Sequence, residues 1–289
     1  MDNSILNLYK KCLLCPRKCN VDRTSGQLGF CKANSEIMIT SYMPHCFEEP
    51  PISGAKGSGT IFFSYCTGQC CYCQNYNFSR GRCGKNTSIE NLAGIMLELQ
   101  DKGCHNINLV SPTQYVPSII MAIDMARKNL LNIPILYNSG GYESIETIEL
   151  LRGYVDIYMP DAKYSDDILA KNHCEFVEYS KYNISALKKM REQVGNLQID
   201  EKGIAQKGLL IRHLVLPGYI KNTKNMLDLI IKNLNSDIYI SLMSQYSPIA
   251  HVKHDSNLGR RLNIDEYEET KDYMEKLGFS NGWIQDFFG

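Results

Sequence analysis

Short apolar runs alternate with amphipathic stretches along the chain from about residue 60 onward. Each run is rich in β-branched or aromatic side chains, which is typical of strands buried in a sheet. The expected strands are residues 60–65, 106–110, 133–138, 155–160, 209–216 and 237–243. Because strands that alternate with helices form parallel βαβ units, this pattern predicts an α/β protein.

The stretches between the runs carry the end signals of helices. Thr87 and Glu90 have the spacing of a capping box ahead of a helical apolar period, and Gly103 follows that period. Pro117 stands where the first turn of the next helix is expected. Further helices are expected at residues 143–152, 181–194, 223–234 and 265–277.

Repeated βαβ units can form either a doubly wound sheet or a full or partial barrel. In both architectures the working side chains lie on loops at the carboxyl ends of the strands, where this chain has "SPTQY", "NSGG" and "PDAK". The first 58 or so residues are rich in Cys, Pro and Gly and show no long helical period. We therefore expect an irregular Cys-rich segment at 1–58, ahead of a βα domain at 59–289.

Composition narrows the classes of function. Lys plus Arg and Asp plus Glu number 31 each, so the net charge gives no argument for binding nucleic acid or an anionic membrane. No run approaches the roughly 20 apolar residues of a membrane span, and the first residues lack the pattern of a signal peptide. We therefore expect a cytoplasmic protein, whose 12 cysteines favour metal sites over disulfides because that compartment is reducing.

Three cysteines, Cys66, Cys70 and Cys73, follow the first expected strand with the spacing C-x3-C-x2-C. Thiolates are the ligands of iron–sulfur clusters, and three of them on a four-iron cluster leave one iron open to a chelating molecule. Cys71 adjoins Cys70 and should point away from the same cluster. The alternative is a closed structural site, with zinc or with Cys83 as the fourth ligand of an electron-transfer cluster.

The motif C-x3-C-x-aromatic-C, with Tyr72 as the aromatic residue, resembles that of the radical S-adenosylmethionine (SAM) superfamily. The run "EEPPISGAKGSGTIFFSYCTGQCCYCQN" is similar to the subgroup related to pyruvate formate-lyase activating enzymes, and the resemblance continues through "NINLVSPTQY", "DIYMPDAKY", "IRHLVLPG" and "SLMSQYSP". The resemblance implies a partial (β/α)6 TIM-like barrel. It also implies an oxidoreductase that cleaves SAM reductively at a [4Fe–4S] cluster to a 5′-deoxyadenosyl radical, which abstracts a substrate hydrogen.

The resemblance assigns roles around the cluster. It makes Cys66, Cys70 and Cys73 the cluster ligands and places Tyr72 beside the adenine or the cluster, although Tyr72 could equally be an ordinary loop aromatic. The loop after the second strand holds the SAM amine in this superfamily. Here that loop offers no carboxylate, and its candidate acceptors are Ser111, Thr113 and Gln114, unless the loop is a plain turn around its proline.

Two further loops resemble SAM-binding positions. Asp161 and Lys163 form an Asp-x-Lys pattern placed near the SAM ribose and carboxylate, and the alternative for them is an exposed ion pair. Strand alternation puts Arg212 and His213 on opposite faces, so only one faces the interior. By resemblance we expect Arg212 to face inward toward the SAM carboxylate, with the reverse assignment as the alternative.

Other polar residues near the expected barrel mouth are candidates for substrate contacts or for structural roles. They are Glu48, Glu49, Gln245, Tyr246, His251 and His254.

The segment "CLLCPRKCNVDRTSGQLGFC" supplies a tight cysteine trio and a distant fourth, which is the pattern of a closed four-thiolate site. Its ligands would be Cys12, Cys15, Cys19 and Cys31. Zinc or a second [4Fe–4S] cluster fits, and Gly26 and Gly29 let the loop return to the trio. The alternative is free thiols that share one face of a helix. We expect free thiols at the remaining positions, Cys46, Cys71, Cys83, Cys104 and Cys174.

Two classes of function follow from these features. The first is a radical enzyme whose substrate is a glycyl loop of a partner protein, a peptide or a small molecule, with a reductant such as flavodoxin or ferredoxin. The second is an electron-transfer or structural metalloprotein without catalysis. A zinc protein that binds nucleic acid is disfavoured, because the net charge is zero.

Overall fold

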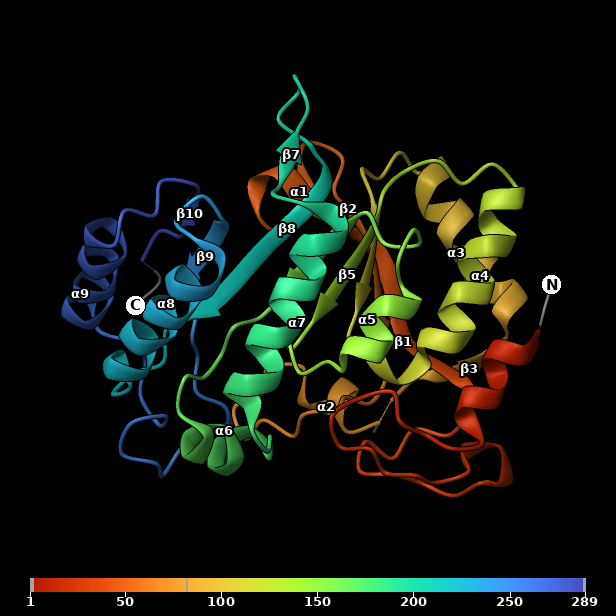
Figure 1. Cartoon of the computed structure of the whole chain (residues 1–289), viewed down its shortest axis with the longest axis horizontal. Helices are drawn as coiled ribbons and strands as arrows, with labels where there is room; N and C mark the ends of the chain where they lie inside the picture. Colours follow the sequence, from red (N-terminus) through yellow and green to blue (C-terminus); the bar gives the residue numbers. More distant parts are fainter. Residues whose placement is uncertain (1–2, 82, 288–289) are drawn as a thin grey trace.

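The computed structural model describes residues 3–81 and 83–287, and one sheet organises this part of the chain (Figure 1). Its strands lie in the order β10-β9-β8-β6-β5-β4-β2-β1-β3. The neighbours from β2 to β10 are parallel. These strands are β2 (Ser58–Phe63), β4 (Ile107–Val110), β5 (Ile135–Ser139), β6 (Ile157–Pro160), β8 (Ala205–Leu214), β9 (Tyr239–Met243) and β10 (Gly282–Ile284).

The parallel strands are neighbours in the order in which they occur along the chain. A doubly wound sheet reverses its strand order at a switch point, and this sheet does not, so the arrangement is that of a partial barrel. All six expected strands form, and β10 adds a further parallel strand that was not expected. The predicted fold class is confirmed.

An antiparallel strand, β1 (Ile37–His45), occupies the outer edge of β2 and keeps the barrel open. It lies in the segment expected to be irregular. Ile37 and Ile39 are buried, whereas residues 42–44 are exposed, so β1 carries an apolar signal over only its first half. The other antiparallel strands are β3 (Lys85–Thr87), which pairs with β1, and β7 (Gln198–Ile199), which pairs with β8.

Helices cover the outer face of the sheet (Figure 1). The longer ones are α3 (Ile89–Asp101), α4 (Val116–Lys128), α5 (Ile145–Leu150), α6 (Asp167–Cys174), α7 (Tyr179–Val194), α8 (Ile220–Leu234) and α9 (Ile264–Lys276). The predicted cap of α3 was wrong by one residue. Ser88, not Thr87, accepts the hydrogen bond from the Asn91 amide, because Thr87 still belongs to β3.

Short helices occupy the connections. They are η1 (Asn3–Tyr9), η2 (Arg23–Ser25), α1 (Pro50–Ser53), α2 (Tyr76–Ser79), η3 (Thr113–Tyr115) and η4 (Ala250–Val252). Figure 1 shows the red N-terminal segment and α2 at the same end of the molecule, below the sheet. None of the helices in residues 3–81 and 83–287 combines the length and hydropathy that a membrane crossing requires.

Candidate functional site

The interior of the barrel changes from apolar to polar toward the carboxyl ends of its strands. One apolar layer contains Leu136, Met159 and Leu210, from three neighbouring strands. Side chains two residues apart share a face of a strand. The next side chains on this face, toward the carboxyl ends, are therefore those of Asn138, Asp161 and Arg212. The strand alternation therefore delivers an amide, a carboxylate and a guanidinium to one level of the interior.

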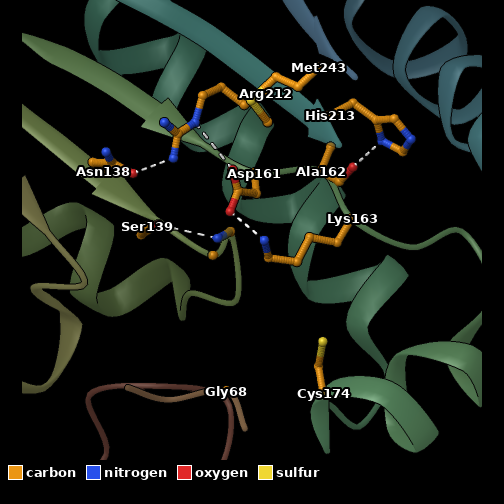
Figure 2. A network of polar contacts seen from close by, with 12 residues as sticks. Gly68, Asn138, Ser139, Asp161, Ala162, Lys163, Cys174, Arg212, His213 and Met243 are labelled. Carbon is orange, nitrogen blue, oxygen red and sulfur yellow. Dashed lines mark hydrogen bonds and ion pairs between the residues drawn. The ribbon is translucent and has the colours of Figure 1, made fainter. Parts of the chain in front are cut away.

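These groups form one network with Lys163, shown in Figure 2 with Asp161 between the two cations. The Lys163 Nζ lies 2.5 Å from Asp161 Oδ2, and Arg212 Nε lies 3.3 Å from Asp161 Oδ1. Arg212 also donates to Asn138 Oδ1 at 2.7 Å and to Glu48 Oε2 at 3.1 Å. The network contains two cations and two carboxylates, so it is electrically balanced.

The network is buried, which excludes the alternative of an exposed ion pair. The Asp161 and Lys163 side chains are only 14% and 18% exposed. Burial raises the pKa of Asp161, but Lys163 and Arg212 outweigh it and hold the pKa below its usual value. Burial lowers the pKa of Lys163, yet Asp161 raises it overall, so the ammonium stays protonated. The cations are thus fixed as charged groups.

The loop after β2 carries the cysteine motif and lies against α6. The amides of Gln69 and Cys71 donate to the carbonyls of Cys174 and His173. Gly68 is required here, because a Cβ at this position would lie 2.4 Å from the Phe176 ring. The loop therefore packs closely on the end of α6 and is held in one shape.

The motif cysteines are enclosed by this loop. The Gly68 amide donates to Cys66 Sγ at 3.4 Å, as backbone amides do to cluster thiolates. Burial raises the pKa of Cys66 to about 12, so its thiol stays protonated unless a metal binds. Cys174, expected to be a free thiol, lies in hydrogen-bond contact with Cys70. The carbonyl of Cys83 accepts from Thr40 and Ser64, and a ligand role for Cys83 stays a prediction.

A cavity of about 410 Å³ separates the motif loop from the polar network. Its size is within the usual range for small-molecule sites. Cys70, Tyr72 and Cys73 line one side, and Asp161, Lys163, Asn138 and Arg212 line the other. The structure thus brings the motif and the SAM-binding candidates of two strands to one space.

A family comparison decides what this site belongs to. The family model of the radical SAM superfamily matches residues 60–230, more than half of the chain. The matched part includes the cysteine motif and, from the polar network, Asn138, Asp161, Lys163 and Arg212. This chain belongs to the radical SAM superfamily. Membership implies a radical enzyme that uses a [4Fe–4S] cluster and SAM.

An uncharacterized protein of Methanocaldococcus jannaschii is 29% identical to this chain over 280 residues, which cover 93% of this chain and 76% of that protein. Methylornithine synthase (PylB) has a TM-score of 0.53 and 14% identity, over 80% of this chain and 73% of the other. A structure of anSMEcpe with bound AdoMet has a TM-score of 0.53 and 10% identity, over 74% and 57%. At these identities the solved structures show a shared fold.

The cavity fits a radical SAM cluster and its cofactor. Two of the three motif thiols, Cys70 and Cys73, line the cavity from one loop. The buried ammonium and guanidinium across from them suit a carboxylate such as that of SAM. No three His, Cys, Asp or Glu side chains in the described residues are close enough to hold a single metal ion. A four-iron cluster does not need that, because each thiolate binds a different iron.

The Tyr72 side chain is packed against other aromatic residues. Its hydroxyl lies 2.7 Å from the Tyr164 hydroxyl, and its ring meets the Tyr246 ring at 5.9 Å. Tyr72 and Tyr246 both line the 410 Å³ cavity. A contact of Tyr72 with adenine stays a prediction.

The second-strand loop borders the space beside the N-terminal cysteines. Thr113 Oγ1 donates to Glu143 Oε1 at 2.7 Å, and Gln114 donates to the carbonyls of Ser64, Tyr65 and Ser111, so the loop is tied back to the motif strand. Thr113 and Gln114 line the space beside the N-terminal cysteines and do not line the 410 Å³ cavity. Their binding of the SAM amine, like that of Ser111, stays a prediction.

The orientation expected at the fifth predicted strand is confirmed. Arg212 points into the interior, whereas His213 points the other way, toward Ala162 (Figure 2). The Nδ1–H of His213 donates to the Ala162 carbonyl, and Nε2 accepts from the Thr223 hydroxyl at 3.0 Å. His213 is therefore a neutral, fully paired imidazole between the sheet and α8.

This histidine predicts a pH dependence of stability. Burial lowers the pKa of His213 to about 4. Below its ordinary pKa of about 6.5 the unfolded chain binds a proton that the folded chain excludes, so stability is lost as pH falls from about 6.5 toward 4. We expect His213→Gln to remove about 2 kcal/mol of the loss between about pH 7.5 and 5. Urea unfolding at both pH values measures this, and an unchanged pH dependence in the variant contradicts it.

A second cavity, of about 240 Å³, adjoins the first at Arg212. Its walls include residues 47–50 beyond β1 and residues 283–286 at β10, so it lies where the sheet stays open. Glu49 lines it at 9% exposure, and its Oε2 has no hydrogen-bond partner among the described residues. Burial raises the pKa of Glu49, although Arg212 opposes that rise.

The remaining candidates near the mouth separate into two groups. Gln245 and Tyr246 line the 410 Å³ cavity, as does Glu48. His251 and His254 are exposed and line neither cavity. The ring of His251 contacts the ring of Tyr76 in a tilted arrangement, with 4.2 Å between the ring centroids.

The N-terminal cysteines do not lie on a helix, so the free-thiol alternative based on a shared helical face was wrong. The 3-10 helix η1 ends at Tyr9, and residues 12–22 form irregular backbone with one turn. The four cysteines line one enclosed space with Arg17 and Arg23. The division at residues 58 and 59, and the metal at these cysteines, stay predictions.

Several site residues escaped the sequence analysis. Asn138 had a signal, because it opens the "NSGG" loop after an expected strand. Glu143, whose pKa burial raises to about 7, had none, since its partner Thr113 is distant in the sequence. The same is true of the contact between Cys174 and Cys70.

Proposed function

We propose that this chain binds a [4Fe–4S] cluster through Cys66, Cys70 and Cys73, cleaves SAM reductively and abstracts a hydrogen atom from a substrate. The observation that supports this is the 410 Å³ cavity, which has the motif loop on one side and the buried cations on the other. When bound, the cluster supplies one electron that splits SAM into methionine and a 5′-deoxyadenosyl radical.

The chain's own residues orient the cofactor. Arg212 and Lys163 offer hydrogen bonds to the SAM carboxylate, and Asp161 holds both cations in place. Ser111, Thr113 and Gln114 belong to the loop that we propose as the binding site of the SAM amine. The apolar layer below Asp161 keeps water out of the interior, which protects a reactive radical from side reactions.

The substrate we propose is an extended stretch of polypeptide, as in a glycyl-radical-enzyme activase. The supporting observation is the second cavity at the open side of the barrel, where the buried Glu49 Oε2 lacks a donor. A peptide N–H fills that need, because an unpaired buried oxygen is costly. A small molecule that carries an N–H donor is the second candidate.

Anaerobic reconstitution tests the radical chemistry. We expect the reduced protein to show the EPR signal of a cubane that changes when SAM is added, and to form 5′-deoxyadenosine and methionine. A signal that SAM leaves unchanged, with no nucleoside product, would identify an electron carrier instead.

A separate experiment tests the substrate class. Peptides that contain glycine deuterated at Cα are offered as a pool, and deuterium is followed into 5′-deoxyadenosine by mass spectrometry. We expect transfer from the pool, and we expect Glu49→Gln to reduce it more than Glu36→Gln, which changes an exposed acid. Nucleoside formed without any deuterium would contradict the peptide proposal while leaving SAM cleavage intact.

A further inference from the structure

The N-terminal cysteines surround a small closed space. Cys12, Cys15, Cys19 and Cys31 all line it. Gly29 also lines it, and a Cβ there would lie 2.9 Å from Cys19 Sγ, so only glycine lets the chain return this close to the trio. The fold thus gathers four thiols that are separated by up to 19 positions in the sequence.

Each of the four sulfurs faces a hydrogen-bond donor. The Phe30 amide donates to Cys19 Sγ at 3.4 Å, and the Arg23 guanidinium lies 3.8 Å from Cys12 Sγ. The backbone amides of Arg17 and Ala33 donate to Cys15 and Cys31. Donors converging on every sulfur are what thiolate ligands of a metal require.

Two arginines beside the space also favour a negatively charged metal centre. Arg23 is 2% exposed, and its Nε has no hydrogen-bond partner in the part of the chain that the structure describes. The Arg17 guanidinium lies 3.2 Å from the Phe30 ring centroid and donates to backbone carbonyls. Within residues 3–81 and 83–287 neither arginine forms an ion pair with a carboxylate. Four thiolates on a core of charge +2 carry a net charge of −2, which balances these two cations.

The spacing of the sulfurs selects the kind of metal centre. A zinc ion needs its four sulfurs at about 2.3 Å. No three of these side chains are close enough for one ion, yet all four border one space. A four-iron cluster spreads its thiolates over four iron atoms, so it matches sulfurs that surround a space without meeting at a point.

The space between the N-terminal cysteines adjoins the motif loop after β2. Thr67, which follows Cys66, forms part of its wall, as do Thr113 and Gln114. Arg17 Nε donates to the Thr67 carbonyl at 2.8 Å, and another nitrogen of Arg17 donates to the Glu175 carbonyl at 2.7 Å. The N-terminal space and the motif loop are therefore joined by one side chain.

The outer side of the segment is basic. Between residues 10 and 32 the exposed charged residues are Lys10, Lys11, Lys18 and Lys32, and the first exposed acid after them is Glu36. Lysines beside a metal centre attract an acidic protein and speed its association. A donor with an acidic surface therefore meets this end of the chain first.

We propose that Cys12, Cys15, Cys19 and Cys31 hold a second [4Fe–4S] cluster, which relays one electron from an acidic electron-transfer protein to the SAM-cleaving cluster. The donor protein is oxidised by one electron, the N-terminal cluster is reduced and then reoxidised, and the SAM-cleaving cluster is reduced. No bond forms or breaks in the relay. This inference rests on the proposed function for the last step.

Metal content tests the cluster. We expect about eight iron atoms per chain in the reconstituted wild type and about four in the Cys12→Ala/Cys15→Ala variant. Cys46→Ala, which changes an exposed cysteine outside both sets, should keep about eight. A wild type with about four iron atoms and one zinc ion, or a double variant that keeps all its iron, would overturn the second cluster.

Two reductants test the relay. With reduced flavodoxin, a flavoprotein donor, we expect 5′-deoxyadenosine formation by the double variant to fall to background. With titanium(III) citrate, a small reductant that enters the 410 Å³ cavity directly, we expect it to persist. Equal rates with flavodoxin for the variant and the wild type would overturn the relay. A wild type that forms no product with either reductant would instead refute the proposed function.

Discussion

Replacing Cys70 by alanine is expected to abolish 5′-deoxyadenosine formation and to remove about four iron atoms from each chain. Cys70 is one of the three motif thiols, and two thiolates cannot hold a cubane while leaving an iron open for SAM. Cys70 also lines the 410 Å³ cavity, so its loss removes a ligand at the point where cluster and cofactor would meet. Iron analysis and product measurement on anaerobic protein check this result.

The control is Cys104→Ala, which removes a cysteine that is as buried as a core residue but lies outside both cysteine sets. We expect this variant to keep its iron and its activity. If Cys70→Ala retained both the iron and the product, Cys70 would be excluded as a cluster ligand.

Asp161→Asn is expected to destabilise the cofactor-free chain by about 3–5 kcal/mol. The aspartate is 14% exposed and sits between Lys163 and Arg212. Asparagine keeps the shape but removes the charge, so two buried cations lose the carboxylate that they share, and Lys163 loses its ion pair. The loss is measured by urea unfolding at pH 7, without iron or SAM, so it does not depend on the proposed activity.

Glu149→Gln supplies the matched control, because Glu149 also bridges two cations, Arg152 and Lys189, but its own side chain is 46% exposed at the surface. Solvent weakens such pairs, and we expect a much smaller change than that of Asp161→Asn. A similar effect from both substitutions would mean that the interior network contributes no more than a surface pair. SAM binding by Asp161→Asn should weaken as well, since its two cations lose their common anchor.

The barrel strands could be predicted because they are short apolar runs rich in β-branched and aromatic residues, which is typical of strands buried in a sheet. Their order identifies a barrel only in three dimensions, since the periodicity fits a doubly wound sheet equally well. β1 was missed because its exposed half and Pro44 conceal a strand that is defined by its pairing with β2.

The position of the motif loop after a barrel strand and the inward orientation of Arg212 could be predicted, because each depends on local spacing or on strand alternation. The links between distant segments could not. Arg17 reaches Thr67 across 50 positions, and Thr113 reaches Glu143 across 30. Such contacts leave no periodic trace in one sequence. The placement of Thr113 and Gln114 beside the N-terminal cysteines is a consequence of the same long-range packing.

The sheet does not close, because β10 forms one end of the strand order and β1 and β3 form the other. This opening affects how a substrate can enter the barrel. A closed cylinder admits only what can enter at its rim, and therefore a molecule with a free end or a compact shape. An open barrel is also accessible from the side, so the middle of a long polypeptide can enter and leave without its end passing through the rim.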